Sequence, residues 1–162
     1  MHTWFAGSGQ PTDFAQIIEA VEKHYFNNGT VYIGSDSQPH KGGCILSSAI
    51  VLHGADEQQG GIYFVTREKI LSKEMTVLVT RILAETERTI RIAHDIAHLF
   101  PDIKMEVHVD VSNTDRENAT SNLASMIVGY VTGNGFDCKI KPEAFAAASV
   151  ADKHSKLGNL HD

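Results

Sequence analysis

The stretch VYIGSDS, Val31–Ser37, has the pattern of a short apolar strand that ends in a carboxylate, Asp36. Side chains alternate along a strand, so Tyr32, Gly34 and Asp36 share one face. Because Gly34 has no side chain, there is room beside the acid. Aspartate in loops more commonly caps a turn, which would suit Pro39 just downstream. The stretch alone therefore leaves a turn residue and an active-site acid as alternatives.

The same pattern recurs in MEVHVDVS, residues 105–112. Its apolar residues alternate, which puts Glu106, His108 and Asp110 on the other face of the strand. The simpler interpretation is that Asp110 caps the next helix, although Asp115 is better placed for that. Two acids at the ends of two strands suggest a metal-holding active site, because such sites gather at the carboxyl ends of strands.

The other elements follow from hydrophobic periodicity and from the positions of glycine and proline. An amphipathic helix lies within residues 11–26, with Thr12 or Asp13 as its N-cap. An antiparallel meander and then alternating helices and strands give a core order of βββαβαβα. This order predicts an α/β fold, a mixed five-stranded sheet flanked by helices, with an extra N-terminal helix. The expected strands are 31–35, 44–52, 62–66, 104–111 and 136–141, and the later helices are 72–99, 115–131 and 146–153.

The composition suits a single domain over residues 1–162, with 42% hydrophobic and 21% charged residues. No secretion signal and no apolar stretch near the ~20 residues of a membrane span is visible, so we expect a soluble cytoplasmic protein without a membrane partner. Cys44 and Cys138 form no CxxC pair and are expected to be buried thiols. The formal charge of −6 disfavours non-specific attraction to a polyanion. However, acids gathered around cations count as negative until the metal binds.

The long helix carries a third acid, Glu85, within an apolar stripe. A buried carboxylate without a partner is costly, so an acid there usually meets a cation or hydrogen-bond donors. A structural acid bonded to a neighbouring strand is the alternative. Glu87 falls on the opposite side of the helix and is expected to be a solvated partner of Arg91. The stripe is formed by Met75, Leu78, Ile82, Thr89, Ala93 and Ile96.

A fourth acid, Asp152, lies in the closing segment SVADKHS, where it could equally be a helix-end acid in a frayed tail. Together with Asp36, Glu85 and Asp110 it completes a pattern that resembles the ribonuclease H-like superfamily. Three stretches narrow the resemblance to the YkuK family of ribonuclease H-like proteins. They are YIGSDSQPHKG, VHVDVS and VTGNGFDCKIKPEAFAAASVADKH. The resemblance covers a core at about residues 30–155, leaves residues 1–29 as an N-terminal helical extension, and matches the Glu85 helix by position more than by wording.

The resemblance implies a metal-dependent nuclease that hydrolyses phosphodiester bonds in RNA, DNA or a hybrid. In such nucleases four carboxylates hold two Mg²⁺ or Mn²⁺ ions ~4 Å apart, one activating water and the other stabilising the leaving oxygen. By this resemblance Asp36 bridges the two ions, Glu85 and Asp110 hold one side, and Asp152 completes the other. Four acids so close together predict a raised pKa for at least one of them without metal. His154 would assist proton transfer or product release.

Basic residues near the C-terminus offer phosphate contacts, or form a solvated strand and tail: Lys139, Lys141, Lys153 and Lys156. A zinc protease is a weaker alternative, because HDIAH places His94 and His98 at helical spacing. Asp95 replaces the required glutamate, and no third-ligand motif follows.

A non-catalytic nucleic-acid-binding or regulatory protein on the same scaffold stays open, since fold does not determine activity. The low charge favours it, and the presence of all four acids opposes it. No Walker loop, GxSxG elbow or GxGxxG motif after a strand supports another enzyme class. The sequence does not choose among RNA, DNA and hybrid substrates, between endonuclease and exonuclease, or among oligomeric states.

Overall fold

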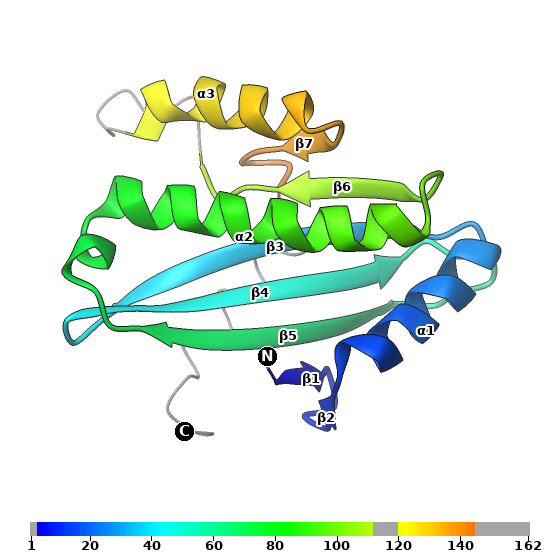
Figure 1. Cartoon of the computed structure of the whole chain (residues 1–162). Helices are drawn as coiled ribbons and strands as arrows, with labels where there is room; N and C mark the ends of the chain where they lie inside the picture. Colours follow the sequence, from blue (N-terminus) through cyan, green and yellow to red (C-terminus); the bar gives the residue numbers. More distant parts are fainter. Residues whose placement is uncertain (1–2, 112–119, 145–162) are drawn as a thin grey trace.

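The computed structural model describes residues 3–111 and 120–144. Within them one mixed sheet has the strand order β2-β1-β5-β4-β3-β6-β7, with helices packed against it (Figure 1). The predicted α/β fold is therefore confirmed. The strands are β1 (Trp4–Ala6), β2 (Pro11–Thr12), β3 (Thr30–His40), β4 (Gly43–His53), β5 (Gly61–Ile70), β6 (Lys104–His108) and β7 (Asp137–Lys139). The helices are α1 (Phe14–Phe26), the 3₁₀ helix η1 (Lys73–Thr76), α2 (Leu78–Leu99) and α3 (Thr120–Gly133).

The predicted meander is present: β3 pairs antiparallel with β4, and β4 with β5. From the edge of this hairpin unit, α2 leads back to β6, which pairs parallel with β3, and β7 then adds parallel to β6. These five strands are those expected from the sequence. The sheet has two more strands because the glycine-rich start folds into β1 and β2, and Trp4 of β1 pairs with Thr66 of β5.

Helices α1 and α2 lie across the same side of the sheet (Figure 1). Asp13 begins α1 with a reciprocal capping box to Gln16, as an N-cap at this position predicts. Between sheet and helices lies the main core, because alternate strand residues point toward the helix stripes. It includes Val31 and Ile33 of β3, Ile50 and Leu52 of β4, Ile17 and Val21 of α1, and Ile82, Ile90 and Ile96 of α2.

The long predicted helix is two helices, because Val77 is extended and separates η1 from α2. Arg81 fixes this break, since its Nη1 donates to the carbonyl oxygens of Met75 and Thr76 at 3.2 and 3.0 Å. As a result Leu78 is exposed rather than facing the core as its spacing predicted. From Ile82 onward the predicted stripe is buried, and α2 ends at Leu99 as expected.

The boundaries of several strands differ from those predicted. Strand β3 runs five residues past the predicted end at Ser35, because it stays paired with β4 out to His40. Strand β6 ends at His108 and not at Val111. The final helix expected at 146–153 lies outside the described residues, as does the start of the helix expected from Asp115. The domain division and the cytoplasmic location stay predictions.

No helix in the described ranges has the length and apolar character that a membrane crossing requires.

Candidate functional site

Strands β3 and β6 separate at one end of the sheet, and the separation creates the candidate site. Their last residue pair is Gly34 with His108. Beyond it β3 continues beside β4, whereas the chain after β6 turns toward β7, where the Val109 N–H donates to the Lys139 carbonyl oxygen at 2.9 Å. Asp36 and Asp110 each lie two residues past the last pair. Asp110 thus follows the carboxyl end of β6, whereas Asp36, predicted at a strand end, lies within β3 just past the end of its parallel pairing with β6. Ligands bind at such carboxyl ends in open α/β sheets.

Asp110 follows the end of β6, in a tight turn where the Val111 N–H donates to the Val109 carbonyl oxygen at 2.9 Å. The strand register confirms that Tyr32, Gly34 and Asp36 share one face of the sheet, together with Glu106 and His108 of β6. The face is the one turned away from α2, since the intervening Ser35 and Ser37 contact that helix. Asp36 is only 6% exposed, and Gln38 Nε2 donates to its Oδ2 at 3.3 Å.

Glu85 approaches from the other side of the sheet, on α2. Its side chain is 5% exposed, and Ser37 Oγ donates to its Oε1 at 2.6 Å. The pKa of Glu85 is raised to about 8: burial is the largest cause, the Ser37 hydrogen bond opposes the shift, and the negative charges of Asp36 and Asp110 add to it. The raised pKa expected for such a cluster is therefore found at Glu85, with burial as its largest cause. Glu87, by contrast, is exposed and pairs with Arg91 at 3.2 Å, as predicted.

Asp110 is paired with a cation. Lys141 Nζ lies 2.7 Å from Asp110 Oδ1, and the Lys141 N–H donates to the Val111 carbonyl oxygen at 2.9 Å. The Lys141 side chain is 56% exposed, so water competes for its ammonium group. Sequence reasoning suggested Lys141 as a phosphate contact and missed this ion pair, which depends on the turn after β7.

Buried hydroxyl groups join α2 to the strands beneath the acids. Thr89 Oγ1 hydrogen-bonds the Ser35 hydroxyl and the Glu85 carbonyl oxygen, each at 2.8 Å, and Ser35 Oγ lies 2.7 Å from Ser48 Oγ. These hydrogen bonds hold the turn of α2 that carries Glu85 against β3. Sequence reasoning missed these serines, although their spacing in SDS and SS places them opposite the polar member of the helix stripe.

One polar atom beside Asp36 is unexplained. Ser47 of β4 pairs directly with Asp36 and points to the same face. It is fully buried, and among the described residues its Oγ has no hydrogen-bond partner. The hydroxyl and the neighbouring carboxylate are oxygen donors of the kind that hard cations bind.

The donor chemistry of the cluster fits a divalent cation in part. Asp36, Glu85 and Asp110 are oxygen donors that interact electrostatically, and no basic side chain of the described residues lies within ion-pair distance of Glu85. Over residues 3–111 and 120–144, however, no three or more His, Cys, Asp or Glu side chains form a group that could hold a metal. Lys141, Gln38 and Ser37 bind the carboxylates instead, so a cation would have to displace these contacts.

The remaining predicted site residues, Asp152 and His154, lie outside the described residues, as do Lys153 and Lys156. The zinc alternative gains no support from the described part of α2. His94 Nε2 lies 3.0 Å from Asn134 Oδ1, and its ring packs edge-on against Phe136. His94 is thus occupied in joining α2 to the segment before β7.

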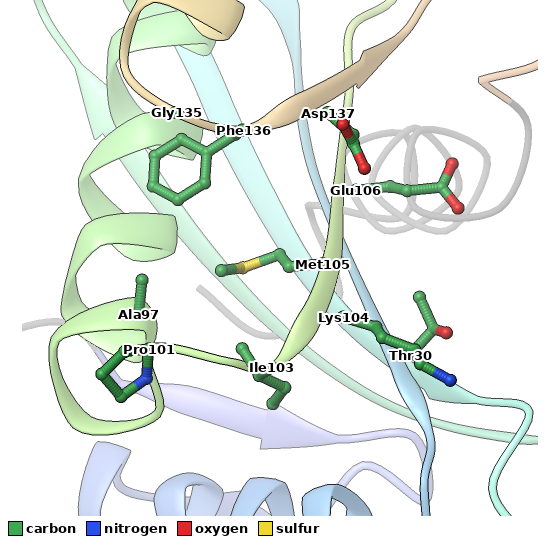
Figure 2. A pocket seen from close by; sticks show the side chains of 10 residues that line it. All are labelled: Thr30, Ala97, Pro101, Ile103, Lys104, Met105, Glu106, Gly135, Phe136 and Asp137. Atoms are coloured by element: carbon green, nitrogen blue, oxygen red, sulfur yellow. The ribbon is translucent and has the colours of Figure 1, made fainter.

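A cavity of about 430 Å³ lies at the opposite end of β6 from the carboxylates. Its apolar wall includes Ile103, Met105 and Phe136, and Figure 2 shows Met105 and Glu106 projecting to opposite sides of β6. The cavity is lined by the first residues of β3 and β6, so it is separate from the site at their carboxyl ends.

The comparisons agree with this architecture. A model of the family described as "Ribonuclease H-like" matches residues 13–156. The chain is also similar to "Uncharacterized protein YkuK" of Bacillus subtilis (strain 168), with 28% identity over 148 residues that cover 84% of each chain. The resemblance inferred from the three sequence stretches is thereby confirmed.

Proposed function

Because the chain belongs to the ribonuclease H-like family, we propose that it is a metal-dependent nuclease that hydrolyses phosphodiester bonds in RNA, DNA or a hybrid. The observation that carries the proposal is Glu85, a carboxylate buried on α2 and close enough to Asp36 and Asp110 for their negative charges to raise its pKa. A purely structural scaffold has no need to bury an acid on an apolar helix face.

The residues that would hold Mg²⁺ or Mn²⁺ are Asp36, Glu85 and Asp110, with Asp152 from outside the described residues. When bound, a pair of such ions supplies an activated water and stabilises the leaving oxygen of the scissile phosphate. The Ser37 hydroxyl, which donates to Glu85 Oε1 at 2.6 Å, holds the Glu85 carboxyl group beside β3. Burial favours the protonated form of Glu85. A bound cation would displace that proton, and the ionised carboxylate would then be a further negative ligand.

Lys141 would act at the substrate side of the site. Its ammonium group is half-exposed and bound to Asp110, so a cation that takes over Asp110 would free it to pair with a phosphate. His154 is proposed to assist proton transfer or product release.

A non-catalytic nucleic-acid-binding or regulatory protein is the second candidate. It is favoured by the contacts that Gln38 and Lys141 make to Asp36 and Asp110, because carboxylates satisfied by protein donors have less need of metal. On this alternative the same face would bind nucleic acid without cleaving it.

The test is a titration of Mg²⁺ and Mn²⁺ into the wild type and the Asp36→Asn variant. Calorimetry and thermal unfolding report metal binding, and labelled RNA, DNA and hybrid are assayed for cleavage in parallel. We expect metal to raise the unfolding temperature of the wild type and to support cleavage, and both effects to disappear in Asp36→Asn. Metal binding without cleavage of any substrate would support the second candidate, and no binding at millimolar metal would refute the nuclease.

Lys141→Met is expected to tighten metal binding about fivefold, because it removes a half-exposed cation whose pairing with the Asp110 carboxylate is worth on the order of 1 kcal/mol. Dissociation constants for Mn²⁺ measured by calorimetry check this. Lys104→Met is the matched control, since Lys104 is an exposed lysine at the other end of β6. Equal changes in the two variants would show an effect of net charge alone and would contradict competition between Lys141 and the metal.

A further inference from the structure

A second cavity of about 490 Å³ lies on the sheet face turned away from α2. Tyr32 of β3 and Glu106 and His108 of β6 form part of its wall. Tyr32 alternates with Gly34 and Asp36 along β3, so it points to the same face as Asp36. His108 is the last residue of β6 and precedes Asp110 by two residues. The His108 end of the cavity is therefore the end nearest to the proposed reaction site, and the cavity does not include that site.

His108 is the unusual residue of this cavity. Its side chain is 3% exposed, and neither ring nitrogen has a hydrogen-bond partner among the described residues. Glu106 Oε1 lies 3.5 Å from Nε2, which is within the range of an ion pair but at the outer limit of a hydrogen bond. Buried polar side chains without partners are rare in folded proteins, and they cost free energy. An imidazole held in this way has hydrogen-bonding capacity for a molecule that enters the cavity.

The rest of the lining indicates the chemistry of that molecule. The rings of Tyr32 and His108 lie 5.3 Å apart, tilted by 58°, and offer surfaces on which a planar ring can pack. Two carboxylates, Glu106 and Glu143, oppose one ammonium group, that of Lys139. This excess of acid disfavours a phosphate inside the cavity. It favours a group that donates hydrogen bonds, because ionised carboxylates only accept them.

We propose that this cavity binds a nucleobase that carries an exocyclic amino group: cytosine, adenine or guanine. The base packs against Tyr32, its ring atoms hydrogen-bond His108, and its amino group donates to Glu106. Carboxylates accept from base amino groups in this manner in other protein–nucleic acid contacts. The proposal rests on the nuclease function, because it makes the base in the cavity the neighbour of the phosphate held near Asp36 and Asp110.

The test measures binding of the four nucleoside 5′-monophosphates CMP, AMP, GMP and UMP to the whole chain in the presence of EDTA. We expect the three amino-bearing nucleotides to bind at least tenfold more tightly than UMP. His108→Phe should weaken their binding at least tenfold while leaving the unfolding temperature equal to or above that of the wild type, since it removes two unpartnered polar atoms. His98→Phe is the matched control, because His98 is an exposed histidine in the last turn of α2.

Glu106→Gln provides a second variant with little risk to the fold, because Glu106 is partly exposed. It should weaken binding of the amino-bearing nucleotides at least fivefold. A large fall in unfolding temperature in His108→Phe would show that His108 has a structural partner and would overturn the proposal, as would equal binding of UMP. Metal-dependent cleavage by the wild type without binding of any monophosphate would reject the cavity and keep the nuclease. Nucleotide binding by a wild type that cleaves none of the substrates would keep the cavity and reject the nuclease.

Discussion

In the Glu85→Gln variant, the free energy of unfolding of the metal-free protein is expected to exceed that of the wild type at alkaline pH. The pKa of Glu85 is about 8 in the folded chain, compared with 4.5 for an ordinary glutamate. Below the lower value both states are protonated and the two proteins should be alike. As the pH rises between the two values, the unfolded chain loses the proton that the folded chain retains, so the wild type loses stability.

Above about pH 8 the difference should become constant, with an upper limit of roughly 5 kcal/mol at about 1.4 kcal/mol per pKa unit. Glutamine does not titrate and still accepts the Ser37 hydrogen bond, so its profile should lack this loss. Urea unfolding at a series of pH values measures the difference. Glu87→Gln is the matched control, because it changes an exposed acid two residues away on the same helix. Parallel profiles for Glu85→Gln and the wild type would contradict the buried-acid interpretation.

The same variant separates stability from metal binding. Mg²⁺ or Mn²⁺ should stabilise the wild type at neutral pH and release a proton, because the ligand must be ionised. Glu85→Gln should show neither the stabilisation nor the proton release, although it is the more stable protein without metal. Lower stability without metal, combined with a requirement for metal binding, is expected of a functional residue that destabilises the fold.

Sequence reasoning located the acids because each stands in a periodic pattern. Alternation along β3 and β6 put Asp36 and Asp110 on one face, and helical spacing put Glu85 in the inward stripe of α2. The periodicity of the sequence alone did not show that Glu85 lies on the opposite side of the sheet from Asp36, where its carboxyl group contacts Ser37. That arrangement depends on where β3 and β6 separate, which is a property of pairing between distant segments.

Other features were missed for similar reasons. Strands β1 and β2 are too short and rich in glycine and polar residues to show a period, and they form because the edge of β5 is available. His108 was assigned to the polar face of its strand, and its burial depends on Tyr32 and β7 packing around it. The Lys141–Asp110 pair joins residues on either side of α3, and no local pattern indicates it.

The Asp110→Asn variant is expected to lower the rate of metal-dependent cleavage about 1000-fold. A carboxylate that holds a catalytic cation contributes several kcal/mol of transition-state stabilisation, and each 1.4 kcal/mol corresponds to about a tenfold change in rate. Asparagine keeps the shape and one oxygen but removes the charge, and it leaves Lys141 without its ionic partner. The fold should be preserved, because Asp110 lies just past the end of β6 and, among the described residues, pairs with the half-exposed side chain of Lys141.

The measurement is kcat/KM on whichever substrate the wild type cleaves, at saturating Mn²⁺, with unfolding temperatures recorded for each protein. Asp137→Asn is the control, since Asp137 is an exposed acid at the start of β7, on the same sheet face as Glu106. A loss of less than tenfold in Asp110→Asn would remove this acid from the metal-binding set. It would also assign the Lys141 pair a structural role in closing the turn between β7 and the end of β6. A loss shared equally by Asp137→Asn would instead indicate a general effect of charge on substrate binding, because that acid pairs with Glu106, away from the point where β3 and β6 separate.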